Sequence, residues 1–453
     1  MPEVAWVCGI IVRSTNAITL RAIYGAQAAY GMRILLGRPG GVPAVPILSP
    51  FVIGVGSQRD RESHTDPVPK DALQEIALLS ATDSTGSWQL PLGGIFGEHP
   101  GMFDVGIVGS GPAGASCAAF CAAAGLRTVL LEREKFPREK VCGDCLNPSC
   151  TPVLERLGVA ERVRGLTHGS LTRVEFIAIG GKTVRVALPA GAEIAVKRSL
   201  FDQLLMSHAA ETGAEVREGV TVTALSQREQ WELTADGDII QARVLVAADG
   251  RNSTVARLLG LQPRIEKERV GLQTHLPLPP GFGERVVLQF LAEGYSGQAP
   301  VGNGELNLCL VGRPASVPAL RRWAEARFGI SATHPWRTIT PLRRAAIPPA
   351  QPRAFLIGDV ARVVEPFTGE GIYYALRSGE LAAQAIAALL RDGDEVAAAN
   401  SYRAAHAELY RGRLWVNRIA RAAVLSPRIT SMLLSAGLLP ASLLGALTAK
   451  IVR

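Results

Sequence analysis

The sequence has few of the features of a secreted, disulfide-rich or nucleic-acid-binding protein. It has seven cysteines among 453 residues, an odd number, and Arg13 and Arg21 break the early apolar stretch without a cleavage-like site after it. This argues against a secretory signal peptide and fits a reducing, cytoplasmic compartment. No basic segment interleaved with aromatic residues indicates nucleic acid, although the net charge is +8 and favours an anionic partner. With 47% hydrophobic residues, the chain can bury a large core.

The clearest pattern begins at Phe103, where an apolar run leads into a glycine-rich turn. The run predicts a buried strand, and the glycines after it have the G-x-G-x-x-G spacing of a dinucleotide-binding turn. Such glycines allow a tight bend, close approach of a pyrophosphate, and close packing of helix on strand. The alanine-rich helix that follows would direct its N-terminal N–H groups at the phosphates. The cofactor-binding residues predicted here are Gly109, Gly111, Pro112, Ala113 and Gly114.

A second predicted strand, residues 127–131, ends at Glu132. This carboxylate follows Gly114 by 18 residues, close to the spacing of the acid that holds the adenosine ribose hydroxyls. Glu132 and its neighbour Arg133 are therefore predicted cofactor-binding residues. Strand, turn, helix, strand and acid in register favour a dinucleotide fold over an ordinary glycine-rich turn.

Two more aspartates come directly after apolar runs of strand length, one after residues 244–248 and one after residues 354–357. Open α/β sheets bind ligands at the carboxyl ends of their strands. A ribityl chain has several hydroxyls that need carboxylate acceptors there, whereas a plain nicotinamide domain does not need them. These strand ends therefore favour a flavin. Their predicted cofactor-binding residues are Asp249, Gly250, Ser253, Gly358 and Asp359.

The three motifs, in this order and at this separation, resemble the para-hydroxybenzoate hydroxylase-type FAD superfamily, which carries GxGxxG, then DG, then GD. That family also has an arginine at the start of a helix, placed toward the flavin, and Arg198 matches it. The resemblance implies FAD as the cofactor and adds Arg198 and Val222 to the cofactor-binding residues.

Two further segments look like the geranylgeranyl reductase-like branch of that superfamily. Residues 136–144, with Lys140 and Cys142, are similar to its K-x-C-G segment, and residues 360–375 are similar to the segment after its GD motif. The resemblance spans residue 102 to the C-terminus. Glycines of the second segment would let the backbone approach the flavin ring, and the helix that follows would direct its positive end at the ring. The ring contacts implied are Gly143, Gly369, Gly371 and Ile372.

One segment departs from that branch, whose members usually carry an aromatic Y-x-W-x-F-P segment lining a lipid cavity. Residues 295–300 correspond to it here: Tyr295 and Pro300 match, but Gly297 stands at the tryptophan position. The departure bears on a prenyl substrate, though not on the flavin. The W-x-W-x-I-P signature of flavin-dependent halogenases is not found in the sequence.

The predicted fold class is α/β, α+β overall: a Rossmann-like FAD-binding domain interleaved with an antiparallel β-sheet substrate domain, and a helical C-terminal tail. The discontinuous FAD-binding domain is predicted over residues 102–165, 192–258 and 350–390. The substrate-binding sheet is predicted over residues 166–191 and 259–349, where stretches such as 285–290 alternate with the period of a half-buried strand. Residues 391–453 form the helical region.

Residues 1–101 match nothing in the resemblance and are punctuated by glycine and proline. We expect a poorly ordered extension there, or an artefact of start-site choice, because Met102 directly precedes the first strand of the flavin domain.

The C-terminal region is basic and apolar. Residues 403–453 contain eight lysines or arginines and one acid, Glu408. This pattern predicts either an amphipathic helix resting peripherally on an anionic membrane or a helix packed on the body with a solvated basic face. Residues 429–449 carry no charge and are long enough to cross a bilayer, but Pro440 and interspersed polar residues favour two short helices.

Cys142, Cys145 and Cys150 leave three interpretations open. A zinc site needs four ligands, and no second pair at suitable spacing is present. A redox dithiol beside the flavin would use Cys142 and Cys145. In the simplest interpretation Cys142 shapes the flavin-side loop and the other two are incidental.

Three functions fit these residues. The first is an FAD-dependent oxidoreductase that takes hydride from NAD(P)H, or electrons from a ferredoxin-like carrier, and reduces a C=C bond of a hydrophobic, polyprenyl or quinone-like substrate. This reaction also needs a proton donor, for which Cys142 and Tyr295 are the candidate catalytic residues. The second is oxygen-dependent hydroxylation of an aromatic or polyketide-like substrate on the same fold. The third is a non-catalytic prenyl-binding escort, which predicts degraded ribityl-binding positions, whereas Asp249 and Asp359 are present.

Overall fold

The computed structural model describes the backbone of residues 7–14, 17–24, 28–35 and 51–53, and then residues 101–188, 193–261 and 269–452. The chain divides into two compact units, Met1–Pro91 and Leu92–Arg453. In the first unit four strands pair antiparallel in chain order: β1 (Val7–Ser14), β2 (Ala17–Tyr24), β3 (Ala28–Leu35) and β4 (Phe51–Ile53). The rest of the predicted poorly ordered extension lies outside the described residues, so that expectation stays a prediction.

The second unit contains an eight-stranded sheet with a parallel core. The core strands are β12 (Glu215–Glu218), β6 (Thr128–Glu132), β5 (Phe103–Val108), β15 (Asp238–Ala247) and β22 (Ala354–Leu356). All residues of β6 and the last four of β5 are buried, as expected for parallel strands covered on both faces. β14 (Trp231–Ala235), β13 (Val222–Gln227) and β21 (Ala350–Gln351) extend the sheet with antiparallel pairs.

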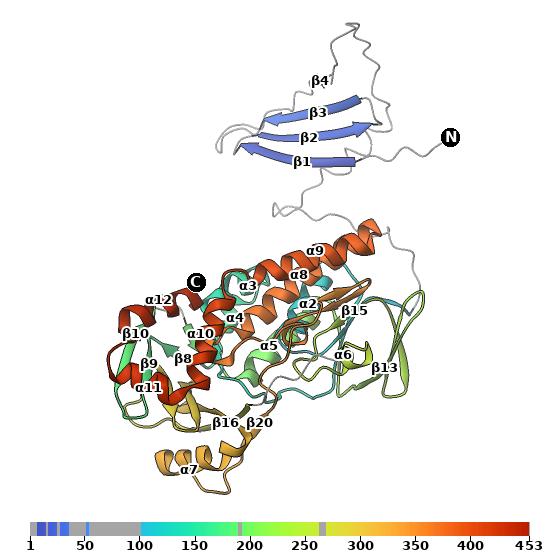
Figure 1. The fold of residues 1–453 in the computed structure, drawn as a ribbon. Coiled ribbons are helices and arrows are strands. Elements are labelled where there is room, and N and C mark those ends of the chain that lie inside the picture. The colour runs from blue at the N-terminus through green and yellow to red at the C-terminus, as the bar shows by residue number, and fades with distance from the viewer. Residues whose placement is uncertain are drawn as a thin grey trace. The chain divides into compact units, whose positions relative to one another are not determined.

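Helices cover one face of this sheet. They are α2 (Pro112–Ala123), α5 (Arg198–Glu211), α8 (Gly371–Asp392) and α9 (Glu395–Leu409), with α2 lying between α5 and α8 (Figure 1). α2 consists almost entirely of small residues, so it can be buried on all sides. A Cβ on Gly379 of α8 would lie 2.5 Å from the carbonyl oxygen of Ala113, so this helix crossing requires glycine.

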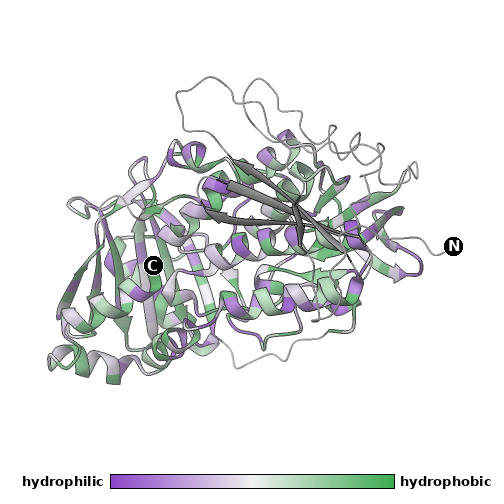
Figure 2. Cartoon of the chain, turned by 90° about the horizontal axis from the view of Figure 1, so that it is seen from above, coloured by the Kyte–Doolittle hydropathy of each residue, from purple (hydrophilic) through white to green (hydrophobic). Residues whose placement is uncertain are grey.

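A second, seven-stranded sheet follows the order β10-β9-β17-β18-β19-β16-β20. Its strands are β10 (Thr183–Ala187), β9 (Arg173–Ile177), β17 (Arg285–Leu291), β18 (Gly294–Pro300), β19 (Glu305–Gly312), β16 (Val270–Pro277) and β20 (Arg337–Ile339). All neighbours are antiparallel except β9 and β17. Hydrophobic and hydrophilic residues are interspersed over the helices and strands of this unit (Figure 2). The predicted α/β architecture with an antiparallel second sheet is confirmed.

Shorter elements lie between the strands and helices described above. They are β7 (Cys145–Leu146), β11 (Glu193–Ala195) and β8 (Gly169–Leu171), which form a small antiparallel sheet, and α3 (Thr151–Arg156), α4 (Ala160–Arg164), α6 (Thr254–Leu258) and α7 (Val317–Phe328). The short 3-10 turns are η1 (Pro148–Cys150), η2 (Pro314–Ser316), η3 (Gly358–Val360) and η4 (Pro366–Thr368). The core strands of the first sheet come from the segments predicted for the FAD-binding domain, and the strands of the second sheet from the substrate segments. The exact domain boundaries stay predictions, because the unit is one compact body.

Three helices end the chain: α10 (Leu414–Leu425), α11 (Pro427–Ser435) and α12 (Ala441–Val452). The expected division around Pro440 is confirmed, since α11 ends before it and α12 begins after it. Among residues 101–452, outside the gaps 189–192 and 262–268, no helix is both long and apolar enough to cross a membrane.

Candidate functional site

Three motifs that are distant in sequence meet at the carboxyl end of the parallel sheet. Gly109, directly after β5, has a φ of +102°, and a Cβ built on it would lie 2.6 Å from the carbonyl oxygen of Ala248. Gly358 has a φ of +57°, and its Cβ would lie 3.0 Å from that of Ala113. The glycine turn after β5 is therefore in direct contact with the segments that follow β15 and β22.

The turn presents polar groups that have no protein partner. α2 begins at Pro112, and its N-cap, Gly111, offers no side chain to the first N–H groups of the helix. The Oγ of Ser110 is buried and has no hydrogen-bond partner. A Cβ on Gly114 would lie 1.8 Å from the carbonyl oxygen of Gly109, so the turn tolerates only glycine there. Uncapped N–H groups at a helix N-terminus and an unsatisfied hydroxyl suit the phosphates of a dinucleotide.

Glu132 lies beside this turn. Its Oε2 accepts a hydrogen bond from the backbone N–H of Ser110 at 2.8 Å, and the residue is buried at the end of β6. Arg133, in contrast, is exposed and pairs with Glu134, and Val222 is buried at the start of β13. Neither Arg133 nor Val222 lines the cavity described below, and their contact with the cofactor stays a prediction.

The carboxylate of Asp249 is hydrogen-bonded to groups four to six residues further along the chain. Its Oδ2 accepts hydrogen bonds from the N–H groups of Thr254 at 2.6 Å and Val255 at 3.1 Å, and the Ser253 hydroxyl donates to its Oδ1 at 2.5 Å. Burial raises the pKa of Asp249, although these hydrogen bonds oppose the effect. Asp249 and Ser253 thus fix the start of α6, a role the sequence did not reveal, and their direct contact with FAD stays a prediction. The neighbouring Gly250 lines the cavity.

Asp359 lies at the edge of the same cavity, opposite Gly250. Arg251 donates to its Oδ2 from Nε at 3.2 Å and from Nη2 at 2.9 Å, while Nη1 of the arginine is buried without a partner. Both residues line the cavity. The structure therefore adds Arg251 to the candidate site. In the sequence it directly follows the Asp249-Gly250 motif, and this adjacency is the pattern that could have identified it.

A second helix N-terminus borders the cavity. α8 begins at Gly371, and its N-cap, Glu370, makes no capping hydrogen bond. Gly369 has a φ of +71°, and no atom lies within 4 Å of a Cβ built on it or on Gly371. The positive end of α8 thus faces open space, where it favours negative charge. The predicted ring contacts Gly369, Gly371 and Ile372 all line this space.

Cationic side chains cluster between the turn and Cys142. Arg198 donates to Asp202 from Nε at 2.7 Å and from Nη2 at 2.6 Å, and Nη2 of Arg138 lies 3.1 Å from the same carboxylate. Burial lowers the pKa of the Arg198 guanidinium, but the charge of Asp202 more than offsets burial and raises the pKa above its ordinary value. Arg198 lines the cavity, at the start of α5 as the resemblance implied.

Lys140 is the third cation of this cluster and also lines the cavity. Burial, together with the charges of Arg198 and Arg138, lowers the pKa of Lys140 to about 8. In the sequence Lys140 is part of the K-x-C-G segment, and it was not among the predicted site residues. A lysine that titrates near neutrality in a cavity is a candidate for ligand binding.

The loop that carries Cys142 is held by residues of the second sheet. The carbonyl oxygen of Cys142 accepts hydrogen bonds from Nδ2 of Asn307 at 2.9 Å and from Sγ of Cys309 at 3.1 Å. Two residues further on, the buried Asp144 lies with its Oδ2 2.8 Å from Nε2 of His275. Burial raises the pKa of the Cys142 thiol, so the thiol stays protonated near neutral pH. These partners come from β16 and β19, and no local pattern in the sequence indicated them.

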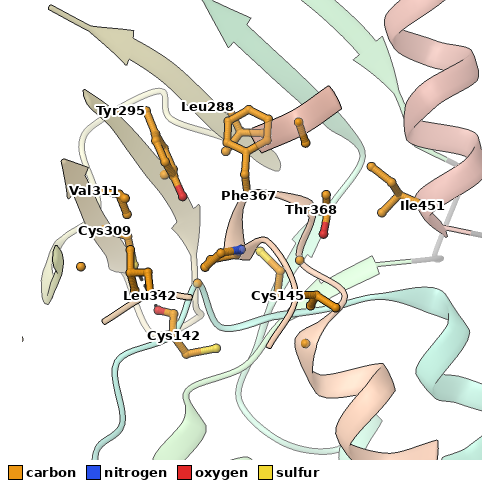
Figure 3. A pocket seen from close by; sticks show the side chains of 18 of the residues that line it. Cys142, Cys145, Leu288, Tyr295, Cys309, Val311, Leu342, Phe367, Thr368 and Ile451 are labelled. Atoms are coloured by element: carbon orange, nitrogen blue, oxygen red, sulfur yellow. Dashed lines mark hydrogen bonds between the residues drawn. The ribbon is translucent and has the colours of Figure 1, made fainter. Parts of the chain in front are cut away.

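One continuous cavity of about 660 Å³ joins these motifs to the second sheet and the C-terminal helices. The predicted residues that line it are Gly111, Pro112, Ala113, Cys142, Gly143, Arg198, Gly250, Tyr295, Gly358, Asp359, Gly369, Gly371 and Ile372. Across from the glycines the lining is apolar. Figure 3 shows Cys142, Tyr295 and Phe367 around the same space, with Ile451 on its far side. The two candidate catalytic residues therefore lie in one cavity, and Cys145 lines it as well.

The apolar side is centred on Tyr295 of β18. Its ring packs edge-on against Phe367, with ring centroids 5.2 Å apart. Burial and the charge of Glu365 raise the pKa of Tyr295 well above its ordinary value. On the same strand, a Cβ on Gly297 would meet only Cys309 and Leu288, both at 3.9 Å. The position that departs from the family segment therefore opens onto free space in the cavity.

Hydrogen bonds and ion pairs join the loop before α8 to the start of β16 and to the start of α10. Arg269 forms two hydrogen bonds with Glu365, at 3.0 and 2.6 Å. The N–H of Glu365 donates to Oδ1 of Asn417 at 2.9 Å, and Nδ2 of Asn417 donates to Glu370 at 2.9 Å. Arg413 also donates to Glu370, at 3.2 Å. Arg413 and Asn417, at the start of α10, are thus bonded to Glu370, which precedes the first residue of α8.

Comparisons with known proteins identify an FAD-binding domain and related reductases. A family model described as an FAD binding domain matches residues 102–278. A menaquinone reductase of Mycolicibacterium smegmatis is 33% identical over 327 residues, which cover 62% of this chain and 75% of the relative.

Solved structures agree with the fold. A flavin-dependent brominase has a TM-score of 0.65 at 21% identity, covering 78% of this chain and 93% of its own. A geranylgeranyl bacteriochlorophyll reductase-like protein of Thermoplasma acidophilum has a TM-score of 0.59 at 20% identity, covering 78% and 92%. At this level of identity both likenesses concern the fold alone.

Proposed function

Because this chain belongs to the geranylgeranyl reductase-like branch of the para-hydroxybenzoate hydroxylase-type FAD-dependent oxidoreductases, we propose that it reduces a C=C bond of a hydrophobic, quinone-like or polyprenyl substrate. The hydride would come from NAD(P)H. The observation that carries this proposal is the single cavity that joins the dinucleotide motifs to an apolar lining. Such a cavity suits a flavin at one end and a hydrophobic substrate at the other.

The residues present fit FAD. The uncapped start of α2 and the free hydroxyl of Ser110 would hold the pyrophosphate, and Glu132 would hold the adenosine ribose. Asp359 borders the cavity where the ribityl chain would lie. The N-terminus of α8, with the open space above Gly369, would face the ring. When bound, FAD supplies hydride transfer to and from carbon, and the protein supplies binding, orientation and electrostatics.

Two residues would hold the proton that alkene reduction requires. Burial raises the pKa of both the Cys142 thiol and the Tyr295 hydroxyl, so each carries its proton at neutral pH. A general acid must be protonated at the working pH and must reach the substrate. Both line the cavity, Cys142 on the side of the cationic cluster and Tyr295 on the apolar side. Loss of the operating donor should lower kcat by about 10²–10⁴-fold.

The shape and chemistry of the lining support the proposed substrate class. Phe176, Phe290 and Phe367 form part of the far wall, and leucines of α11 and α12 continue it. This lining can exclude water and bind a hydrocarbon chain. The space beside Gly297, where branch members carry tryptophan, leaves room for a ring, which favours a quinone-like head group over a bare prenyl chain. A menaquinone is thus a suitable first test substrate.

The test is anaerobic turnover by the purified holoprotein. A short-chain menaquinone with NADPH or NADH should give a product that, after the ring is reoxidised to the quinone, is still heavier by two hydrogen atoms per C=C bond reduced, as detected by mass spectrometry. Cys142→Ala and Tyr295→Phe should lower that turnover while the flavin absorbance is kept. A product that gains oxygen under air, with no reduced product under nitrogen, would show a monooxygenase instead. Protein that purifies without flavin and cannot be loaded with FAD would favour the escort.

A further inference from the structure

The C-terminal helices expose an unusual number of large apolar side chains. Of the eleven large hydrophobic residues that are exposed among the described residues, seven lie on α10, α11, α12 and the turn before α12. We call this the C-terminal surface; its residues are Trp415, Ile419, Leu425, Ile429, Met432, Leu438 and Leu443. Concentrated apolar exposure of this kind marks an interaction site, because scattered single residues are the norm elsewhere.

The exposed residues follow the helical repeat. On α10, Trp415 and Ile419 lie one turn apart, and on α11 Ile429 and Met432 do the same. The opposite faces of the two helices are also apolar, because Val424 and Leu434 belong to the core beneath the second sheet. Packing on the body therefore accounts for one apolar face and leaves the other exposed to solvent.

The charges carried by these helices have one sign. No aspartate or glutamate occurs after Glu408, whereas seven lysines or arginines do. Arg418 and Arg428 are exposed on α10 and α11, and Lys450 is exposed on α12. A second copy of the chain would bring like charges together at such a surface. An anionic lipid surface would instead complement it, with the arginines at the headgroups and the apolar side chains below them.

The cavity opens at this surface. Ile419 and Ile429 line the cavity, yet they are 48% and 57% exposed. Residues that are both lining and exposed mark an opening, and Ile419 and Ile429 place one such mouth between α10 and α11. A substrate that leaves a lipid phase through this mouth would enter the apolar end of the cavity without crossing water.

We propose that the C-terminal surface docks on an anionic lipid bilayer and that the cavity mouth between α10 and α11 admits the substrate from the lipid. Docking rests only on the exposed side chains and charges, whereas the entry route also rests on the proposed hydrophobic substrate. The contact is interfacial, in keeping with the lack of a membrane-crossing helix among the described residues.

The test is sedimentation of the flavin-loaded full chain with sucrose-filled vesicles. The chain should bind vesicles of equal parts phosphatidylglycerol and phosphatidylcholine, and it should bind pure phosphatidylcholine far more weakly. Reversal of two surface charges by Arg418→Glu with Arg428→Glu should weaken binding to the anionic vesicles at least about tenfold. Met432→Glu should also weaken it. None of these three residues lines the cavity.

Ile239→Glu is the matched control, because Ile239 is 64% exposed on β15 while Met432 is 63% exposed. It should leave vesicle binding unchanged. Turnover of a short-chain quinone in solution should be the same in all variants, whereas turnover of a long-chain quinone held in the vesicles should fall with binding. The proposal would be overturned if the wild-type protein did not bind anionic vesicles. It would also be overturned if the Met432→Glu and Ile239→Glu variants bound them equally well. A dimer in solution that buries the C-terminal surface would overturn it as well. Binding is read without turnover, so inactivity on quinones would refute the proposed function and leave docking intact.

Discussion

The two sides of the cavity are built from different parts of the chain. On the flavin side much of the surface is backbone: Gly109, Gly358 and Gly369 turn the chain there, and helix N-termini supply polar groups beside charged side chains such as Arg198. On the substrate side, strands and short helices present side chains such as Phe367 to the same space. Backbone contacts bind what is common to all flavin dinucleotides. Side chains can change without disturbing the fold, so the substrate side is where specificity is set.

The largest effect on flavin binding should come from substitutions in the glycine turn. In Gly114→Ala the new Cβ would lie 1.8 Å from the carbonyl oxygen of Gly109, so the turn cannot form and flavin binding should be abolished. In Gly111→Ala the nearest atom is Nη2 of Arg138 at 3.8 Å, so the protein should fold but bind FAD poorly. The flavin-to-protein absorbance ratio and thermal unfolding of the apoproteins separate the two results. Two equally stable apoproteins would contradict the steric argument.

The next largest effect should be a loss of stability when the buried ion pair of Arg269 and Glu365 is broken. Arg269→Met leaves the buried Glu365 without its counter-ion, which should lower the free energy of unfolding by about 3–5 kcal/mol. Arg162→Met removes an ion pair of half-exposed side chains, and the loss there should be about 0–1 kcal/mol. Urea unfolding of both flavin-loaded variants measures the difference. Restoration by Arg269→Met with Glu365→Leu would confirm that the unpaired charge is the cause.

Specificity should change on the substrate side alone. In Gly297→Trp the indole would fill the open space beside Cys309 and Leu288, so kcat/KM for a ring-bearing quinone should fall about tenfold or more, as expected for a lost pocket. Flavin content should not change. The ratio of kcat/KM for a quinone to that for an open-chain prenyl substrate is the decisive measurement. An unchanged ratio would remove Gly297 from the specificity determinants.

The smallest effect should be a pH dependence on the flavin side. The pKa of Lys140 is lowered to about 8, so its charge disappears as pH rises through that value. Affinity of the apoprotein for FAD should then fall about tenfold, roughly the 1.5 kcal/mol at the low end for a hydrogen bond to a charged group. Because the unfolded chain binds that proton more tightly, apoprotein stability should rise over the same pH range. Both trends, followed by fluorescence titration and thermal unfolding, should be absent in Lys140→Met.

The fold prediction was confirmed, whereas the predictions for the C-terminal helices and for the cysteines were tested only in part. The helix break near Pro440 followed from proline and polar residues alone and was confirmed. Whether the basic helices rest on lipid was open, and the structure shows that their apolar residues lie both in the cavity and on the surface. The dithiol of Cys142 and Cys145 stays a prediction, although both line the cavity.

Local patterns in the sequence predicted the flavin side, because glycine spacing, strand periodicity and strand-end acids follow local rules with few alternatives. They predicted Gly111 and Asp359, and the family resemblance predicted Arg198; all three line the cavity. The packing of the folded chain, in contrast, directs Asp249 to the first N–H groups of α6, brings Asn307 and His275 to the Cys142 loop, and sets α10 and α11 at the mouth. These contacts join elements more than a hundred residues apart, or depend on which way a side chain turns. Packing of the whole chain fixes such choices, so no local pattern records them.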